Sequence, residues 1–345
     1  MERLEQTVFG PKAEYNAVMD QIREDREVYD QFLGLSEPMK EELVEFCMGV
    51  RGVKITYDPF FKFVFDPEVN PERLEDLIGL CLRQKARIMA VIPNESKRIT
   101  EESSLMVMDV LVRLESGDFV NVEIQRFGYL FPGARCACYS SDLLMRQYSQ
   151  VRARTRKEKR RFSYGDIKKV YTIVLMQQSP KEFHDHPGKY LHYARQKFNT
   201  GLNYDMLQEY VLVPLDIFLK IPHNELSRLD AWLYFIASDG MKDICRVIEA
   251  YPEFREIYRE VFQFRYQVKE VMGMFSEALR ILDANTTQYM IEEQQKELAE
   301  QKKELLERCQ ELEAGRLELE IIHRELEEAW RENEQLRTLL REREK

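Results

Sequence analysis

Two apolar runs in the first half of the chain, residues 105–114 and 119–126, are separated by a short polar stretch that ends in Gly117. Apolar runs of this length bounded by turn residues are typical of β-strands. A three-residue hairpin loop usually ends in a glycine with positive φ, and Gly117 stands at that place. We therefore predict an antiparallel hairpin in which Leu114 pairs with Asp118, and a fold that contains a β-sheet.

The predicted register brings two acidic residues together. Strand 119–126 alternates, so that Val120, Val122 and Ile124 face one way and Phe119, Asn121, Glu123 and Gln125 face the other. Counting back from Gly117 places Asp109 directly opposite Glu123, with the two Cβ atoms about 5 Å apart. Such carboxylates repel each other and are costly to bury, and a divalent cation would relieve both problems. The alternatives are an arginine partner, such as Arg113 or Arg126, or exposure to solvent.

The rest of the chain mixes helices and strands. Three- and four-residue apolar spacing predicts helices, and short apolar runs predict strands. The expected helices are 12–50, 58–65, 70–84, 133–151 and several after 224, and the further strands are 87–93, 170–176 and 210–219. Strands mixed with helices, followed by helices alone, predict an α/β core with a helical appendage.

The last part of the chain has a seven-residue repeat. Its positions are Ile291, Leu298, Leu305, Leu312, Leu319, Leu326, Asn333 and Leu340. A sustained heptad predicts a coiled coil, although the second core position of the repeat is mostly polar. A single solvated helix with Glu–Lys pairs is the alternative. We expect four segments: a helical segment (1–52), a core (53–222), a helical appendage (223–285) and a coiled coil (286–345).

Composition and charge limit the partners, cofactors and cellular location expected for the protein. Of the formal net charge of −10, residues 291–345 contribute −6, so the acidic balance says little about what the body binds. The six Cys residues form no framework, which predicts reduced thiols. No apolar signal segment and no run of 18 apolar residues are found, so we expect a cytoplasmic protein, or one associated with the nucleoid, and no membrane partner. No glycine-rich phosphate loop is found, so we expect no nucleotide cofactor.

A strongly basic stretch follows the helix expected at 133–151. Its cations are Arg152, Arg154, Arg156, Lys157, Lys159, Arg160 and Arg161. Guanidinium and ammonium groups in this density suit the phosphates of DNA, in contacts that do not depend on base sequence. We expect this segment to be a basic loop that contacts DNA; a solvated surface loop is the alternative.

Several of these stretches together resemble one family. They are "YDPFFKFVF" at 57–65, the Asp109 strand, Glu123-x-Gln125, the helix with Arg135 and Tyr139, and the strand "VYTIVL" after the basic stretch. This combination resembles the PD-(D/E)XK nuclease superfamily, and within it the recombination-promoting nucleases labelled PD-(D/E)XK nuclease family transposases. The resemblance covers roughly residues 50–285. It implies a restriction-endonuclease-like mixed sheet flanked by helices, followed by a helical segment and a long C-terminal coiled-coil helix.

The resemblance also implies site residues. Asp109, Glu123 and the backbone carbonyl of Ile124 would hold Mg²⁺, with Mn²⁺ as the alternative ion. Gln125 stands where the superfamily motif has lysine, a position at which this branch commonly has glutamine. Glutamine can position a water molecule but carries no charge. Asp58 and Lys62 match the N-terminal motif of this branch, with helix capping as the alternative for Asp58. The acidic residue of the first core helix has no secure counterpart, and its candidates are Glu72, Glu75 and Asp76.

The resemblance therefore implies a metal-dependent DNA endonuclease that hydrolyses phosphodiester bonds. The competing hypothesis is a catalytically weak DNA-binding scaffold that forms homo-oligomers through residues 286–345. The two hypotheses differ in whether the protein cuts DNA when a divalent ion is supplied.

Overall fold

The structure, a computed structural model, describes residues 10–93, 109–127 and 133–281, and scattered positions between 298 and 331. The chain divides into two compact units, Met1–Asp283 and Ala284–Lys345. In the second unit the scattered positions are helical, and Leu298, Leu305 and Leu326 of the heptad pattern are exposed. The rest of the coiled coil expected there lies outside the described residues. No helix in the described part of the chain has the length and apolarity needed to cross a bilayer.

A mixed sheet forms the centre of the first unit. Its strands among the described residues are β1 (Ile88–Val91), β2 (Val110–Leu114), β3 (Phe119–Phe127), β4 (Val170–Gln178), β5 (His192–Arg195) and β6 (Gln208–Pro214). They are arranged in the order β1-β2-β3-β4-β6-β5. β3, β4 and β6 are parallel, whereas β1, β2 and β5 pair with their neighbours in antiparallel fashion. β3 and β4 are almost continuously buried, as expected of strands covered on both faces.

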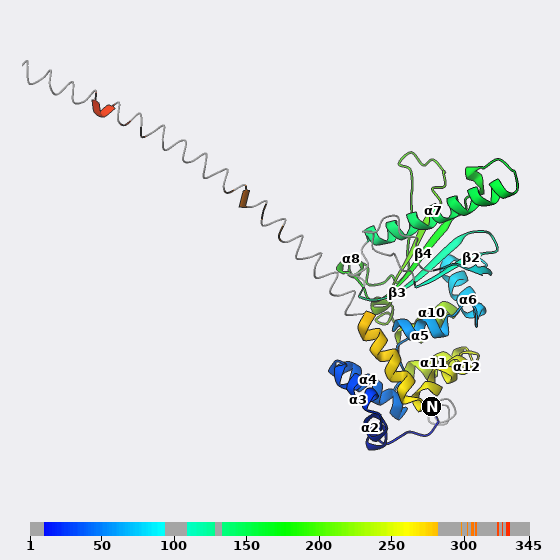
Figure 1. Ribbon diagram of the computed structural model, residues 1–345, viewed down its shortest axis with the longest axis vertical. Coiled ribbons are helices and arrows are strands. Elements are labelled where there is room, and N and C mark those ends of the chain that lie inside the picture. Colours follow the sequence, from blue (N-terminus) through cyan, green and yellow to red (C-terminus); the bar gives the residue numbers. More distant parts are fainter. Residues whose placement is uncertain are drawn as a thin grey trace, which may run out of the picture. The chain divides into compact units, whose positions relative to one another are not determined.

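Helices cover both faces of this sheet (Figure 1). On one face lie α2 (Tyr15–Glu24), α3 (Arg26–Gly34), α4 (Glu37–Met48), α5 (Asp58–Val64), α6 (Pro71–Leu82), α10 (Arg228–Ala237), α11 (Met241–Ala250), α12 (Phe254–Gln263) and the helix at 268–281. On the other face lies α7 (Gly133–Lys157). The shorter helical elements are η2 (Tyr164–Asp166), α8 (Lys181–His184), α9 (Leu215–Phe218) and η3 (Phe264–Tyr266).

Each face of the sheet has its own apolar core. Val120, Val122 and Ile124 of β3 pack into a large cluster that runs from Val18 to Ala278. The opposite face packs a smaller cluster against α7, which includes Leu111, Phe119, Tyr139, Leu143 and Val174. The large cluster contains residues from both the N-terminal helices and the helices after β6. The boundaries expected at 52/53 and 222/223 lie within this single unit and remain predictions.

The hairpin register is confirmed. Val110 pairs with Val122 and Leu111 with Asn121, and the Leu114 amide donates to the Asp118 carbonyl at 2.9 Å. Gly117 has φ of 90°, the positive value that the three-residue loop requires. Turn chemistry and alternation therefore determine this part of the sheet.

Replacing Gly117 with alanine should destabilise the hairpin. A Cβ at this position would lie 3.0 Å from Cγ of Lys168, and φ of 90° is strained for any L-residue. We expect Gly117→Ala to lower the free energy of unfolding by about 1–2 kcal/mol, measured by urea denaturation. Gly188→Ala is the matched control, because a Cβ there meets no atom of the described residues within 4 Å. Equal stability of the two variants would contradict the role given to Gly117.

Three expectations about elements were wrong. The strand expected at 210–219 ends at Pro214 and continues as α9, because proline has no N–H for a further ladder bond. The edge strand β5 was not expected, because its four residues are polar or exposed and show no apolar alternation. The basic stretch was expected to be a loop, but α7 continues to Lys157. The buried face of α7, with Leu143, Gln147 and Thr155, extends this far, so the helix continues with its cations pointing outward.

Candidate active site

Helix α5 presents Asp58 and Lys62 beside the sheet. Phe60, Phe61 and Val64 are buried and hold the helix against the large core. Residues four apart share a helix face, and Lys62 Nζ lies 2.9 Å from Asp58 Oδ2. The side chain of Asp58 is 14% exposed and that of Lys62 is 44% exposed, so the pair lies at the border of the core and the solvent. The N-cap position of α5 is occupied by Tyr57, not by Asp58.

The two hairpin carboxylates lie together. The Ile124 amide donates to Asp109 Oδ2 at 2.7 Å, and the Asp109 amide approaches Glu123 Oε1 at 3.3 Å. Glu123 is 1% exposed, although its side chain lies on the face covered by α7 rather than in an apolar cluster. The register predicted from Gly117 therefore places the carboxyl groups of Asp109 and Glu123 opposite each other across the hairpin.

The buried setting changes the acidity of both groups. Burial, together with repulsion from Asp58, raises the pKa of Asp109 to about 7. The hydrogen bond from the Ile124 amide and the charges of Lys62 and Arg135 oppose this rise but do not cancel it. Burial and repulsion from Asp109 also raise the pKa of Glu123 well above its ordinary range. Burial by itself lowers the pKa of Lys62, but the pairing with Asp58 and the nearby hairpin carboxylates raise it overall. Asp58 and Lys62 therefore act electrostatically on the hairpin pair.

Two neighbouring amides of β3 hold the Glu123 carboxylate. Asn121 Nδ2 donates to Glu123 Oε1 at 2.8 Å, and Gln125 Nε2 approaches Glu123 Oε2 at 3.4 Å. Asn121 is 0% exposed and Gln125 is 8% exposed. The alternation of β3 predicted that these side chains share a face, but not that Asn121 contacts the carboxylate.

Helix α7 contributes a cation to the same place. Arg135 lies in its first turns and lowers the pKa of both Asp109 and Glu123 through its charge. Its Nε and Nη2 donate to Tyr139 Oη at 3.0 and 2.8 Å. Sequence comparison with the family pointed to this helix, but spacing alone carried no signal that Arg135 lies beside the hairpin.

Two of the three acidic candidates on α6, Glu75 and Asp76, are engaged elsewhere. Asp76 Oδ2 accepts hydrogen bonds from Arg228 and Trp232, each at 2.7 Å. Glu75 Oε1 accepts from the Ile88 amide at 2.7 Å, at the start of β1. Asp58, rather than an α6 residue, is therefore the helix carboxylate whose charge acts on Asp109.

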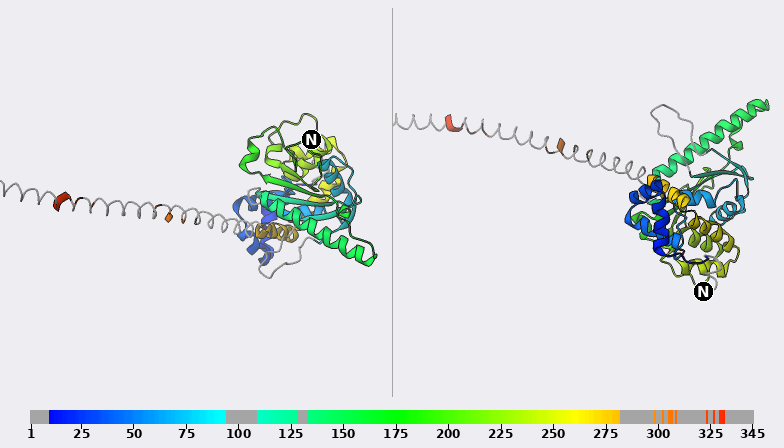
Figure 2. Two further views of the ribbon diagram at one scale, coloured as in Figure 1. Left: turned by 90° about the horizontal axis from the view of Figure 1, so that it is seen from above. Right: turned by 60° about the horizontal axis from the view of Figure 1, so that its bottom comes forward.

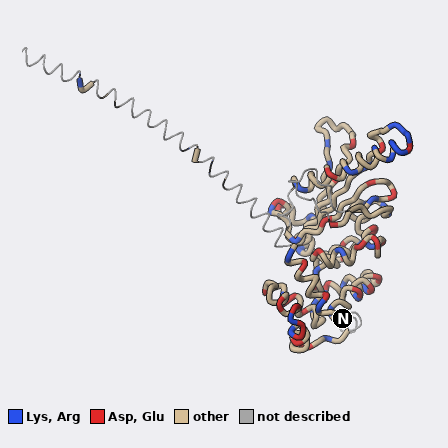
Figure 3. Tube along the Cα trace, in the orientation of Figure 1, with Lys and Arg blue, Asp and Glu red and all other residues tan. Residues whose placement is uncertain are grey.

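The basic cluster, residues 152–161, lies at the far end of α7 from Arg135. Arg152, Arg154, Arg156 and Lys157 are in the last turns of the helix, and Lys159, Arg160 and Arg161 follow. All seven side chains are exposed, and they form the dense basic end of α7 in Figure 3. From Arg135 to Arg156 the helix rises about 30 Å, so this cluster does not adjoin the two hairpin carboxylates.

The donor set is compatible with a hard divalent cation. Among the described residues, no group of three or more His, Cys, Asp or Glu side chains could hold a metal ion by itself. Mg²⁺, however, is usually bound by one or two carboxylates, with water and substrate phosphates as the other ligands. Two buried carboxyl groups that repel each other fit such an ion, because it would offset the repulsion that raises both pKa values.

Asn121→Leu should weaken metal binding without unfolding the protein. The change keeps the number and branching of the side-chain heavy atoms but removes the Nδ2 donor that favours ionised Glu123. Asn121 Oδ1 has no hydrogen-bond partner to lose among the described residues. We expect the affinity for Mn²⁺ to fall about tenfold near pH 7, as for other residues that orient ligands, measured by calorimetry. Thr172→Val is the control, since Thr172 pairs with Asn121 in the sheet and its buried hydroxyl has no hydrogen-bond partner in the part of the chain that the structure describes. Unchanged affinity in Asn121→Leu would contradict this role.

Comparison with known proteins identifies the family of this chain. The family model described as PD-(D/E)XK nuclease family transposase matches residues 56–307, which include α5, the hairpin, α7 and all of β4 to β6. No curated protein and no solved structure gave a match. The mixed sheet with helices on both faces is the restriction-endonuclease-like fold that was predicted. The chain belongs to the family of PD-(D/E)XK nuclease family transposases.

Proposed function

We propose that this protein is a metal-dependent DNA endonuclease whose active site is the Asp109–Glu123 pair of the β2–β3 hairpin. The observation that carries the proposal is the burial of two mutually repelling carboxyl groups with raised pKa values, flanked by the charges of Asp58, Lys62 and Arg135. An arrangement that costs stability in the absence of a cation is typical of functional sites.

Asp109 and Glu123, with the Ile124 carbonyl, would hold Mg²⁺ or Mn²⁺. The bound ion would supply Lewis acidity and a water molecule of lowered pKa. Asn121 and Gln125 orient the Glu123 carboxylate through their amide donors. Gln125 can also orient the attacking water, but it cannot supply the charge that a lysine would.

The cations of the site have a separate task. Lys62 and Arg135 lie close enough to act on both hairpin carboxylates. Positive groups at this position can stabilise the charge that develops on a phosphodiester during in-line attack. Their placement on α5 and α7, on either side of the hairpin, supports a phosphate as the group that is attacked.

DNA is the substrate that the proposal names. The basic cluster supplies seven exposed cations on one end of α7, which suits a polyanion read without regard to sequence. Residues 286–345 would join copies of the chain through their heptad repeat, so that one assembly carries more than one active site. We propose that this activity is cytoplasmic, with association with the nucleoid as the alternative.

The test is cleavage of supercoiled plasmid by the full chain with Mg²⁺, with Mn²⁺ and with EDTA. The proposal expects nicking with either ion and none with EDTA. Nicking that resists EDTA would contradict a metal-dependent site. The complete absence of nicking, with DNA still bound, would favour the second candidate function, a DNA-binding scaffold assembled through residues 286–345.

The observation that favours the scaffold is the neutral side chain of Gln125, because it cannot supply the positive charge that a lysine would give to catalysis. We therefore expect Gln125→Lys to cut DNA faster than the wild type. An ammonium group beside Glu123 would favour the ionised carboxylates and add positive charge near the phosphate. The expected gain in nicking rate is about tenfold, measured on plasmid with Mg²⁺. Gln178→Lys, at the exposed end of β4, controls for added charge. If Gln125→Lys cuts more slowly than the wild type, glutamine is itself adapted to the reaction.

A further inference from the structure

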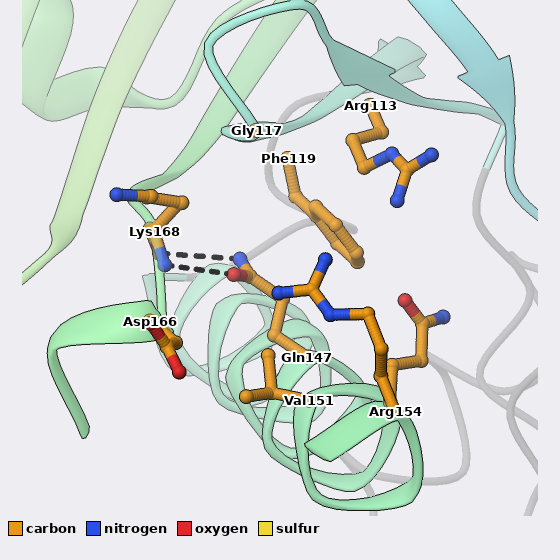
Figure 4. Close-up of a pocket in the computed structure, with 9 residues that line it drawn as sticks. Arg113, Gly117, Phe119, Gln147, Val151, Arg154, Asp166 and Lys168 are labelled. Carbon is orange, nitrogen blue, oxygen red and sulfur yellow. Dashed lines mark hydrogen bonds between the residues drawn. The ribbon is translucent and has the colours of Figure 1, made fainter. Parts of the chain in front are cut away.

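A small pocket lies between the β2–β3 turn, the second half of α7 and the segment before β4 (Figure 4). Its volume is about 170 Å³. Its lining includes Arg113, Phe119, Gln150, Arg154, Asp166 and Lys168. Sites for small organic ligands usually exceed about 300 Å³, so this pocket has room for a single group such as a phosphate rather than a nucleotide.

Two guanidinium groups approach the pocket from different elements. Figure 4 shows Arg113 reaching in from the hairpin and Arg154 from α7, on either side of the Phe119 ring. Both side chains are exposed. No ion pair joins Arg113 to an acidic residue in the described part of the chain, and Arg154 has only a 4.0 Å contact with Glu158. Two converging arginines without close counter-ions form a site for an anion.

The acidic group at the pocket is already paired. Asp166 Oδ2 accepts from Arg160 Nη2 at 3.1 Å. The ammonium group of Lys168 points away from the pocket, so its aliphatic stem forms the wall. The Gln147 side chain is fixed by the Lys168 amide, which donates to it at 2.9 Å. The net charge that faces the pocket is therefore positive.

The pocket has a fixed relation to the candidate active site. Arg113 lies in β2, and Asp109 directly precedes this strand, four positions away, so the two-residue period of a strand predicts that both side chains point to the face of the sheet that α7 covers. Four residues of strand span about 13 Å, which corresponds to about four base-pair steps of B-form DNA at 3.4 Å each. The pocket lies toward the basic end of α7, which extends past the sheet in both views of Figure 2.

We propose that the pocket between Arg113 and Arg154 binds one backbone phosphate of the DNA whose cleavage occurs at the Asp109–Glu123 pair. This inference rests on the proposed function and adds a fixed second contact between the active site and the basic cluster. Such a contact sets the position of the duplex along the hairpin and carries no sequence information.

The test is a double-mutant cycle for DNA binding by the full chain. The variants are Arg113→Gln, Arg154→Gln and the pair, compared with Arg156→Gln and the Arg113/Arg156 pair. Arg156 is exposed on the same turns of α7 but does not line the pocket. Binding is measured in EDTA by fluorescence anisotropy of a duplex about two helical turns long, over a range of salt concentrations.

We expect Arg113→Gln to weaken binding about fivefold and to reduce the dependence of log Kd on log salt by about 0.9, the value for one phosphate contact. If Arg113 and Arg154 share that phosphate, their effects will be non-additive by about threefold or more, whereas Arg113 and Arg156 will be additive. Removing two charges from α2 and α3 by Arg23→Gln and Arg26→Gln, both exposed, should leave binding unchanged.

Wild-type affinity in Arg113→Gln, or additivity in both cycles, would overturn the proposal that the pocket binds a phosphate. The proposed nuclease function would stand if the wild type still nicks plasmid. Equal loss in the Arg23/Arg26 control would overturn it as well, because the effect would then be one of net charge. If Arg113→Gln weakens the binding of an RNA duplex in the same assay but not that of the DNA duplex, DNA is not the occupant of the pocket. A wild-type chain that neither binds nor cuts DNA would overturn the proposed function and the pocket together.

Discussion

Glu123→Gln is expected to reduce divalent-dependent nicking of supercoiled DNA by about a thousandfold, which corresponds to the several kcal/mol that a metal centre supplies. Glutamine preserves the volume of the side chain, and its carbonyl can still accept from Asn121 Nδ2. It lacks the charge needed to hold a divalent ion beside Asp109. The measurement is the initial rate of nicking with Mg²⁺.

Glu115→Gln is the matched control for this experiment. Glu115 lies in the turn of the same hairpin, and its side chain is exposed. The control should nick at the wild-type rate, and both variants should show the same circular dichroism as the wild type. Nicking that persists in Glu123→Gln at the wild-type rate would move the active site away from the hairpin.

Asp109→Asn is expected to stabilise the protein in the absence of metal. The folded-state pKa of Asp109 is raised from 3.8 to about 7, so the folded protein binds a proton more tightly than the unfolded chain does. The contribution of Asp109 to stability should therefore be most favourable below about pH 4 and should fall as the pH rises to about 7. Asparagine removes this loss and can still accept from the Ile124 amide. We expect a gain of about 2 kcal/mol at pH 8, or about 5 °C in the melting temperature.

Calorimetry in EDTA at pH 5 and at pH 8 measures this difference, which should be much smaller at pH 5. Added Mg²⁺ should raise the melting temperature of the wild type and leave that of Asp109→Asn almost unchanged, because a ligand stabilises only the state that binds it. Asp20→Asn serves as the control, since its side chain is 70% exposed on α2. A variant less stable than the wild type at pH 8 would show that the Asp109 charge is already compensated by the protein.

The two predictions address different properties of one site. The first concerns catalysis, and the second concerns the free energy that the site costs when no cation is bound. A protein that loses nicking in Glu123→Gln and gains stability in Asp109→Asn would show that function and stability oppose each other at this hairpin.

Local sequence determined the hairpin. The turn at Gly117 specifies one register, and the two-residue period of β3 specifies one face, so the meeting of Asp109 and Glu123 followed from positions less than 15 residues apart. The same local rules placed the start of α6 at Pro71. They failed for β5, whose residues have no apolar period, and for the end of α7, whose buried face continues among basic residues.

The surroundings of the hairpin depended on tertiary structure. Asp58 and Arg135 reach the carboxylates because Phe60 and Phe61 anchor α5 in one core and Tyr139 and Leu143 anchor α7 in the other. Burial by these two layers of helices raises the pKa values of Asp109 and Glu123, and the spacing of residues in the sequence does not predict this burial. The sequence by itself determined which groups face each other across the hairpin, because turn geometry and strand period are local. Only the packing of distant segments decided their charge state and their neighbours, because desolvation and long-range contacts exist only in the folded chain.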